Sequence, residues 1–223
     1  MAINRPYKAP GELPEIIPVF PLDGVLLLPR CQLPLNIFEP RYLAMIDDAL
    51  AGPRLIGMIQ PDADHSGAPS HPALAGVGCV GRITEIAESG DGRYVLSLTG
   101  VARFRIVREE RAGTSYRQAQ VDFAAFADDF TPNVGAEAVD RATLLRTLAS
   151  YLDANRLEAD WDNIKSAPNE ALVNGLAMMA PFGAREKQAL LEAADLKTRA
   201  DILVAVTEMA LARTIGESDT PLQ

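Results

Sequence analysis

In the first half of the chain, apolar positions come in short runs or alternate with polar ones, which is typical of β-strands. Asp23-Gly24, Gly90-Asp91-Gly92 and Gly100 separate these runs and favour turns. Frequent prolines each remove a backbone donor, so strands over residues 16–35 should be short, bent or at a sheet edge. Strands are therefore expected over residues 15–20, 25–28, 55–60, 77–87, 94–98 and 103–121, the last interrupted near Gly113.

A helical period interrupts this β pattern after Pro40. Proline suits the first turn of a helix, where its missing N–H costs nothing, and Gly52-Pro53 should end the helix. Apolar residues at positions i, i+1, i+4, i+7 and i+8 of this segment predict a helix with one buried stripe. Its members are Tyr42, Leu43, Ile46, Ala49 and Leu50.

The second half of the chain has the period of amphipathic helices. Pro168 suits the first turn of a helix, and Pro181 ends one. Helical runs this close in sequence, each with one apolar face, most simply pack as a small bundle. The expected stripes are Leu144, Leu145, Leu148, Tyr151 and Leu152; Leu172, Val173, Leu176 and Met179; Ile202, Leu203, Val206, Met209 and Ala210; and, in a shorter helix, Leu190 and Leu191.

The sequence thus predicts an α+β fold in which a β-rich N-terminal part precedes a C-terminal α-helical bundle. Residues 61–76 are rich in Pro, Gly, Ser and Asp without a period, so we expect a mobile surface loop there. The expected organisation is an N-terminal tail at 1–14, a β part at 15–121, a linker at 122–135, a helical part at 136–215 and a C-terminal tail at 216–223.

Composition indicates a globular protein of the cytoplasm. The chain of 223 residues is 48% hydrophobic and 23% charged, which is ordinary globular composition. Its apolar runs are too short to span a bilayer, and its N-terminus lacks the apolar core of a secretory signal. Cys31 and Cys79 are therefore expected as reduced thiols.

Charge is distributed unevenly along the chain. Residues 1–121 hold 12 Lys and Arg against 13 Asp and Glu, a net charge of −1. Residues 122–223 hold 9 against 17, a net charge of −8, and the two halves sum to −9. Because an acidic surface repels phosphate, nucleic acid is not an expected partner of the second half.

The chain has no motif that predicts catalysis, a cofactor or a metal. Residues 76–81 match G-x-G-x-x-G, but the β-like run that follows is not the helix that a dinucleotide site needs, which favours a glycine-rich strand where another backbone comes close. His65 and His71 lie in the predicted loop, without the fixed geometry of metal ligands. No nucleophile or P-loop signature is present. We therefore predict no catalytic, cofactor-binding or metal-binding residues.

A basic strand is the one feature that favours RNA. Arg103 and Arg105 should share one face of the predicted strand, with Phe104 and Ile106 on the other, and Arg108 follows. The same alternation is expected of any half-buried strand, and an RNA surface needs a larger basic patch.

Residues 16–50 resemble the opening of the Lon protease N-terminal domain, the substrate-binding domain of an ATP-dependent protease. Their specific features are the order Pro18-Val19-Phe20-Pro21-Leu22, Leu28-Pro29, Leu33-Pro34-Leu35 and Ile37-Phe38-Glu39-Pro40-Arg41-Tyr42. Looser similarity continues through Gly78-Cys79-Val80-Gly81, Leu96-Ser97-Leu98-Thr99-Gly100 and Lys187-Gln188-Ala189-Leu190-Leu191-Glu192.

The resemblance implies a PUA-like, partly open β-barrel followed by a helical bundle. It also implies a module that recognises protein substrates, which in the full protease precedes an ATPase module and a Ser-Lys peptidase. The sequence contains neither the ATPase module nor the peptidase, so the chain is expected to be a stand-alone member of the family.

The leading hypothesis is a non-catalytic module that binds unfolded or partly folded polypeptides and acts with a protease or chaperone. Two alternatives stay open: a small-molecule or RNA binder that uses the PUA-like part, and an unrecognised hydrolase. Most family-motif residues should build the fold, and apolar side chains exposed beside them or between the two halves would shape a binding surface. These motif residues are Pro21, Leu22, Pro34, Ile37, Phe38, Glu39, Pro40, Arg41 and Tyr42.

Overall fold

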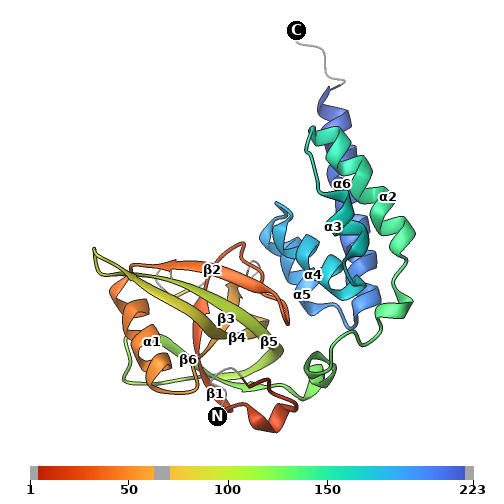
Figure 1. The fold of residues 1–223 in the computed structure, drawn as a ribbon. Helices are drawn as coiled ribbons and strands as arrows, with labels where there is room; N and C mark the ends of the chain where they lie inside the picture. The colour runs from red at the N-terminus through yellow and green to blue at the C-terminus, as the bar shows by residue number, and fades with distance from the viewer. Residues whose placement is uncertain (1–4, 63–70, 219–223) are drawn as a thin grey trace.

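The computed structural model describes residues 5–62 and 71–218 and confirms the α+β class (Figure 1). Within these residues, six strands form one sheet in the order β2-β5-β4-β3-β1-β6. Their bounds are β1 (Ile16–Pro21), β2 (Gln32–Ile37), β3 (Leu55–Pro61), β4 (Leu74–Ser89), β5 (Arg93–Glu110) and β6 (Arg117–Asp122).

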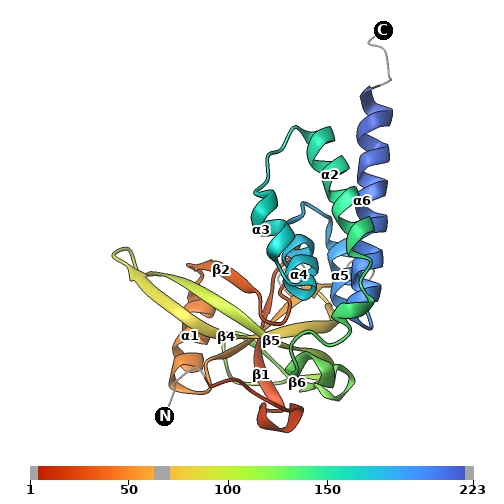
Figure 2. The same cartoon turned by 45° about the vertical axis from the view of Figure 1, so that its right-hand side comes forward.

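The sheet bends into a partial ring. Strand β6 pairs with β1 and also with β5, so β5, β4, β3, β1 and β6 form a closed circuit of pairings. Strand β2 pairs with β5 alone and extends the sheet beyond this circuit. Among the strand pairs of the described residues, only β1 and β3 are parallel; the other pairs are antiparallel. The long β4 and β5 project from the ring as a hairpin (Figure 2).

Two strand predictions were wrong. Residues 25–28 form no strand; Leu26, Leu27 and Leu28 enter the core from an irregular segment. Strand β2 was missed, although its pattern of exposed and buried positions alternates. It lies at the sheet edge, where Pro34 is tolerated because the strand has one neighbour. Strand β1 is not at an edge, but its parallel pairing starts at Val19, after Pro18.

Gly100 lies inside β5 and not in a turn. Its N–H donates to the Cys31 carbonyl (2.9 Å), and its carbonyl accepts from the Arg30 N–H (2.8 Å). A Cβ at this position would come within 2.8 Å of the Leu28 carbonyl carbon and closer still to its oxygen. The glycine therefore permits the close backbone approach of the β1–β2 connection.

The predicted helix after the motif is α1 (Pro40–Ala51), with Pro40 in its first turn and Gly52 as its C-cap. Tyr42, Ile46 and Ala49 are buried as expected, and Met45 joins them. Leu50 is 37% exposed, so the buried stripe is narrower than the sequence indicated.

The C-terminal part is helical, as predicted. It contains α2 (Arg141–Asn155), α3 (Trp161–Ser166), α4 (Asn169–Met179), α5 (Ala184–Glu192) and α6 (Leu196–Ser218). Short 3₁₀ helices lie at η1 (Pro10–Glu12), η2 (Ala124–Phe130) and η3 (Ala136–Ala138). The N-caps Asp140 and Asp160 accept from the N–H groups of Thr143 and Asn163, which fixes two helix starts. Helices α2 and α6 stand side by side and run in the same direction (Figures 1 and 2).

The two parts share one hydrophobic core. One cluster of buried side chains extends from Phe20 and Leu28 of the β part to Leu144, Leu190 and Leu203 of the helical part. A second cluster around Phe104 fills the other side of the ring. Helix η2 lies in the stretch interpreted as a linker, and the predicted boundaries stay a prediction.

Candidate functional site

A buried ion pair joins the ring to the helices. Arg103 of β5 is 4% exposed and binds Asp129 of η2 with two parallel bonds, Nε–Oδ2 and Nη2–Oδ1, both 2.9 Å. Its Nη1 donates to the carbonyls of Leu191 and Ala193, at the C-terminal end of α5. The guanidinium thus neutralises a carboxylate and satisfies orphan helix carbonyls. The interpretation of Arg103 as part of an exposed basic face was wrong, because its side chain is buried and its guanidinium is bonded to groups within the protein.

Further polar contacts reinforce the same junction. Arg30 pairs with Glu170 of α4 and donates to the Asp129 carbonyl. Gln60 of β3 donates to the carbonyl of Ala184 (3.1 Å), and Lys187 donates to the carbonyl of Gly24 (2.8 Å). Both halves therefore hold a defined relative position.

The family motif divides between core and surface. Ile37 and Tyr42 are buried, and the Tyr42 ring lies 4.2 Å from that of Phe20. Pro40 starts α1. Glu39 accepts from Arg41 Nε (3.0 Å), and the Arg41 guanidinium stacks over Tyr42 at 4.5 Å.

The remaining motif residues reach solvent to different extents. Pro21 and Leu22 are half-buried, Pro34 is exposed on β2, and Phe38 is 61% exposed. Val95 of β5 and Ile86 of β4 are also exposed, at 51% and 40%. Three exposed apolar side chains near the projecting hairpin are within what is normal for a protein surface.

A polar pocket of about 780 Å³ brings Pro21, Arg41 and Tyr42 together with His71 and Ser115. His71 lies 3.7 Å from Glu109, and within the described part of the chain no hydrogen bond joins it to Ser115. The hydrolase hypothesis requires a nucleophile bonded to a base, and this pocket gives it no support.

An almost wholly apolar hollow lies in the helical bundle. A cleft of about 210 Å³, here called the bundle cleft, is lined from α2, α4 and α6 and from the segments that follow α2 and α4. Its polar side chains are limited to the hydroxyls of Thr147, Tyr151 and Thr207. The apolar lining consists of Leu144, Leu148, Leu152, Leu157, Leu176, Met179, Ala180, Pro181, Phe182, Leu203 and Val204.

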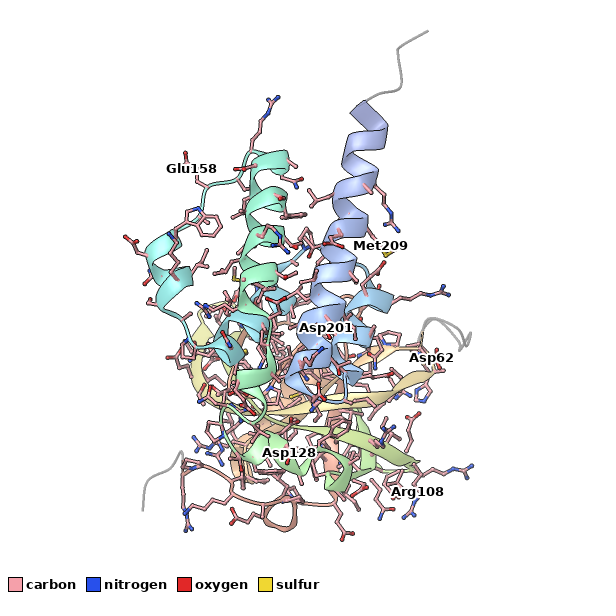
Figure 3. All side chains as sticks on the ribbon, turned by 90° about the vertical axis from the view of Figure 1, so that its right-hand side faces the viewer. Asp62, Arg108, Asp128, Glu158, Asp201 and Met209 are labelled. Carbon is pink, nitrogen blue, oxygen red and sulfur yellow. The ribbon has the colours of Figure 1, made fainter. Side chains whose placement is uncertain are left out.

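The rim of the bundle cleft carries side chains that solvent reaches freely. Met179, at the last position of α4, is 79% exposed, and Leu157 is 53% exposed. The sequence placed Met179 and Met209 in buried stripes, and both predictions were wrong, since each side chain is more than half exposed. Met179 is the last residue of α4, and the chain leaves the helix at Ala180-Pro181. Figure 3 shows Glu158, the residue after Leu157, in the connection that follows α2, and Asp201 and Met209 along α6.

The pattern of residues could indicate the helices that line the bundle cleft but not the cleft itself. Leu144, Leu148 and Leu176 were expected on buried stripes, and they line it from within. Leu157 and Phe182 carried no signal, because each follows a helix and belongs to no period. An apolar residue in an otherwise polar connection, such as Leu157 among Arg156 and Glu158, is the signal that could have found the rim.

The other motifs take structural places. Residues 76–81 lie inside β4, where a Cβ on Gly78 would come within 2.6 Å of the Met58 carbonyl oxygen, as the glycine-rich strand interpretation predicts. His65 falls outside the described residues. Among the described residues, no group of three or more His, Cys, Asp or Glu side chains is arranged to hold a metal ion, and no helix has the length and apolarity to cross a membrane.

Burial controls the two thiols. Cys79 and Cys31 are both free, as expected. Burial in the core, with Asp129 nearby, raises the pKa of Cys79 far above the ordinary range of a thiol. The pKa of Cys31 is also raised, by burial and by Glu170. Burial therefore favours the protonated form of both thiols, and Cys79 is also shielded from reagents in solution.

Known structures share this arrangement of a β ring and a helical bundle. A Lon N-terminal domain protein from Xanthomonas campestris superimposes with a TM-score of 0.60 at 23% identity, over 85% of this chain and 97% of that one. The N-terminal domain of the Mycobacterium avium complex Lon protease gives 0.62 at 18% identity, over 86% and 98%. The fold is thus that of Lon N-terminal domains.

Sequence comparison defines the family. Residues 16–207 match the ATP-dependent protease La (LON) substrate-binding domain, and the chain belongs to that family. Lon protease 2 of Myxococcus xanthus is 28% identical over 197 residues, which are 86% of this chain and 23% of that protein. The Lon protease of Desulfosudis oleivorans is 32% identical over 103 residues. The chain spans about a quarter of the first relative's length.

Proposed function

We propose that this protein is a non-catalytic module that binds unfolded polypeptide segments, and that the bundle cleft receives their apolar side chains. The observation that carries the proposal is an open, almost wholly apolar cleft whose rim residues Met179 and Leu157 are exposed. Membership of a substrate-binding domain family supports it. An adaptor role beside a protease or chaperone is part of the proposal, as is a cytoplasmic location.

Charge indicates which segments the bundle cleft prefers. The half of the chain that contains it carries a net charge of −8, and Glu158 directly follows the rim residue Leu157 in the sequence. Basic residues beside an apolar anchor would therefore be attracted, whereas acidic ones would be repelled. Methionine at the rim adapts to side chains of different shape, which suits a site for many sequences. The expected occupant is an extended segment with bulky apolar residues flanked by Lys or Arg.

The test is a titration of the protein with fluorescent peptides of this composition. We expect binding that weakens at least tenfold, about 1.4 kcal/mol, in the double variant Met179→Gln with Leu157→Gln. Replacing the flanking basic residues of the peptide by Glu should also weaken binding, and added salt should reduce that difference.

Met209→Gln is the matched control, because Met209 is 56% exposed on α6 but does not line the bundle cleft. Phe38→Gln tests the exposed residue of the family motif. Unchanged binding in the double variant would contradict the proposal, and loss confined to Phe38→Gln would move the site to the hairpin of the sheet.

A further inference from the structure

Arg82 of β4 is a buried arginine whose charge has no acidic partner. The residue is 8% exposed, and its Nη1 donates to the Arg5 carbonyl at 2.7 Å. Its guanidinium lies 4.4 Å from the centre of the Tyr7 ring. In the described chain no carboxylate pairs with it, and Nε and Nη2 have no hydrogen-bond partner. Buried charges are normally paired, because leaving water is costly.

Among the described residues, Arg199 is also buried without a carboxylate partner, but it donates to the Leu190 carbonyl and Asn174 Oδ1, and its unpartnered Nη2 is fully enclosed. Two arginines nearer to Arg82 do have carboxylate partners. Arg103 is as deeply buried, but Asp129 and two carbonyls satisfy it. Arg30 pairs with Glu170. The Nε and Nη2 atoms of Arg82 have no hydrogen-bond partner in the described chain, but protein atoms do not enclose them fully. Both atoms therefore remain accessible to solvent or to a ligand.

Arg82 lines a pocket of about 400 Å³, here called the Arg82 pocket, together with Tyr7, Arg30, Thr99 and Asp129. This volume is in the usual range for small-molecule sites. Since Glu170 neutralises Arg30 and Arg103 neutralises Asp129, one positive charge is left over, that of Arg82. The Arg82 pocket is therefore suited to a single negative charge.

The walls of the Arg82 pocket define the rest of the ligand. Val101, Phe130 and Pro132 supply apolar surface, and the Thr84 and Thr99 hydroxyls face each other at 3.0 Å. The Thr84 hydroxyl donates its one proton to the Ser97 carbonyl (3.2 Å), so Thr99 donates to Thr84 and offers the pocket only an acceptor. A carboxylate would therefore accept from Nε and Nη2 of Arg82 while its apolar body lies against the walls.

We propose that the Arg82 pocket binds a carboxylate carried on an apolar body. Both the free C-terminus of a polypeptide that ends in apolar residues and a medium-chain carboxylic acid have this chemistry. The site is separate from the bundle cleft, since the two share no lining residue. An experiment on the Arg82 pocket can therefore fail while polypeptide binding at the bundle cleft is confirmed, and the reverse also holds.

Calorimetry with the full chain tests this proposal with acetyl-Ala-Leu-Leu as the free acid, the same peptide as its C-terminal amide, hexanoate and inorganic phosphate. We expect the free acid or hexanoate to bind at least tenfold more tightly than the amide. Tighter binding of the peptide acid identifies a polypeptide end as the source, and equal or tighter binding of hexanoate identifies a small acid. The proposal would be overturned if neither carboxylate bound more tightly than the amide, or if phosphate bound more tightly than both carboxylates.

Variants place the site on the Arg82 pocket. Arg82→Met removes the charge and keeps the apolar stem; it should abolish the preference for acid over amide and change the melting temperature of the free protein little. Should that variant not fold, Arg82→Lys keeps the positive charge but loses the two parallel donors and should weaken acid binding several-fold. Arg108→Met, at an exposed arginine outside the pocket, is the control and should bind like the wild type. Wild-type preference in Arg82→Met would refute the assignment.

Discussion

The β ring and the helical bundle differ in how completely they enclose their apolar side chains. In the ring, Phe104 is fully buried, and a Cβ at Gly57 or Gly78 would come within 3.0 Å of its ring. In the bundle, Met179 and Leu157 stay exposed at the rim of an apolar cleft. Burial of apolar surface on binding is favourable only where such surface is still exposed. The ring is therefore the scaffold, and the bundle is the part that gains from a partner.

The largest effect is expected at the ion pair that joins the two regions. Asp129→Ala leaves the Arg103 charge buried without its carboxylate and should lower the free energy of unfolding by about 3–5 kcal/mol. Urea unfolding measures the change. Glu110→Ala is the control, since its pair with the exposed Arg108 should contribute less than about 1 kcal/mol. Equal effects of the two substitutions would show that the junction is not a stability determinant.

A glycine in the scaffold should tolerate substitution poorly. Gly100→Ala forces a methyl group against the Leu28 carbonyl and should cost about 3 kcal/mol in the same assay, because backbone atoms must move. Gly76→Ala lies in β4 with open space around the added Cβ, so it should change stability by less than about 1 kcal/mol. If both substitutions were neutral, the ring would be less closely packed than described.

The sealed ring should also lose stability in alkaline solution. Burial raises the pKa of Cys79, so above its ordinary value of 9.0 the unfolded thiol ionises while the folded one stays protonated. Stability is complete below that pH and falls as the pH rises toward the folded pKa, with a slope approaching about 1.4 kcal/mol per pH unit. Urea unfolding at about pH 8, 9 and 10 should show a shallower fall for Cys79→Ala.

A residual alkaline slope is expected in Cys79→Ala. Burial raises the pKa of Tyr42 and Tyr116, and the hydrogen bond from Tyr116 to Asp48 adds to the second shift. If the free energy of unfolding fell equally steeply with pH in the wild type and in Cys79→Ala, the thiol would not be buried in the folded protein as described.

The smallest effect on stability is expected at the rim of the bundle cleft. Met179→Gln with Leu157→Gln changes exposed positions and should shift the free energy of unfolding by less than about 0.5 kcal/mol. Thermal melting measures this shift. A large destabilisation would show that the rim belongs to the core and would remove the contrast between the two regions.

Local pattern predicted the class of fold and most elements, because strands and helices impose their own periods. It could not predict that the backbone of Leu28 lies close to Gly100, or that Leu28 packs in the core from an irregular segment and not from a strand. Both features depend on chain segments distant in sequence. For the same reason Arg103 was interpreted as a surface residue. Its partner Asp129 lies 26 positions away in a stretch without a period.

The candidate site was predictable in part. The stripes of α2, α4 and α6 identified inner walls of the bundle cleft such as Leu144 and Leu176. Its open rim depends on where α4 ends at Met179, and no periodic signal reports whether another segment covers that position. The sequence did not predict the Arg82 pocket. Whether a carboxylate lies near Arg82 can be decided only when the positions of the surrounding side chains are known.

Hydrogen exchange of the protein with and without a bound unfolded polypeptide tests the central claim most directly. Our account predicts slower exchange in α2, in the segment around Leu157, and from the end of α4 to Phe182, with the β ring unchanged. Slower exchange confined to the hairpin of β4 and β5, with α2 and α4 unaffected, would contradict it.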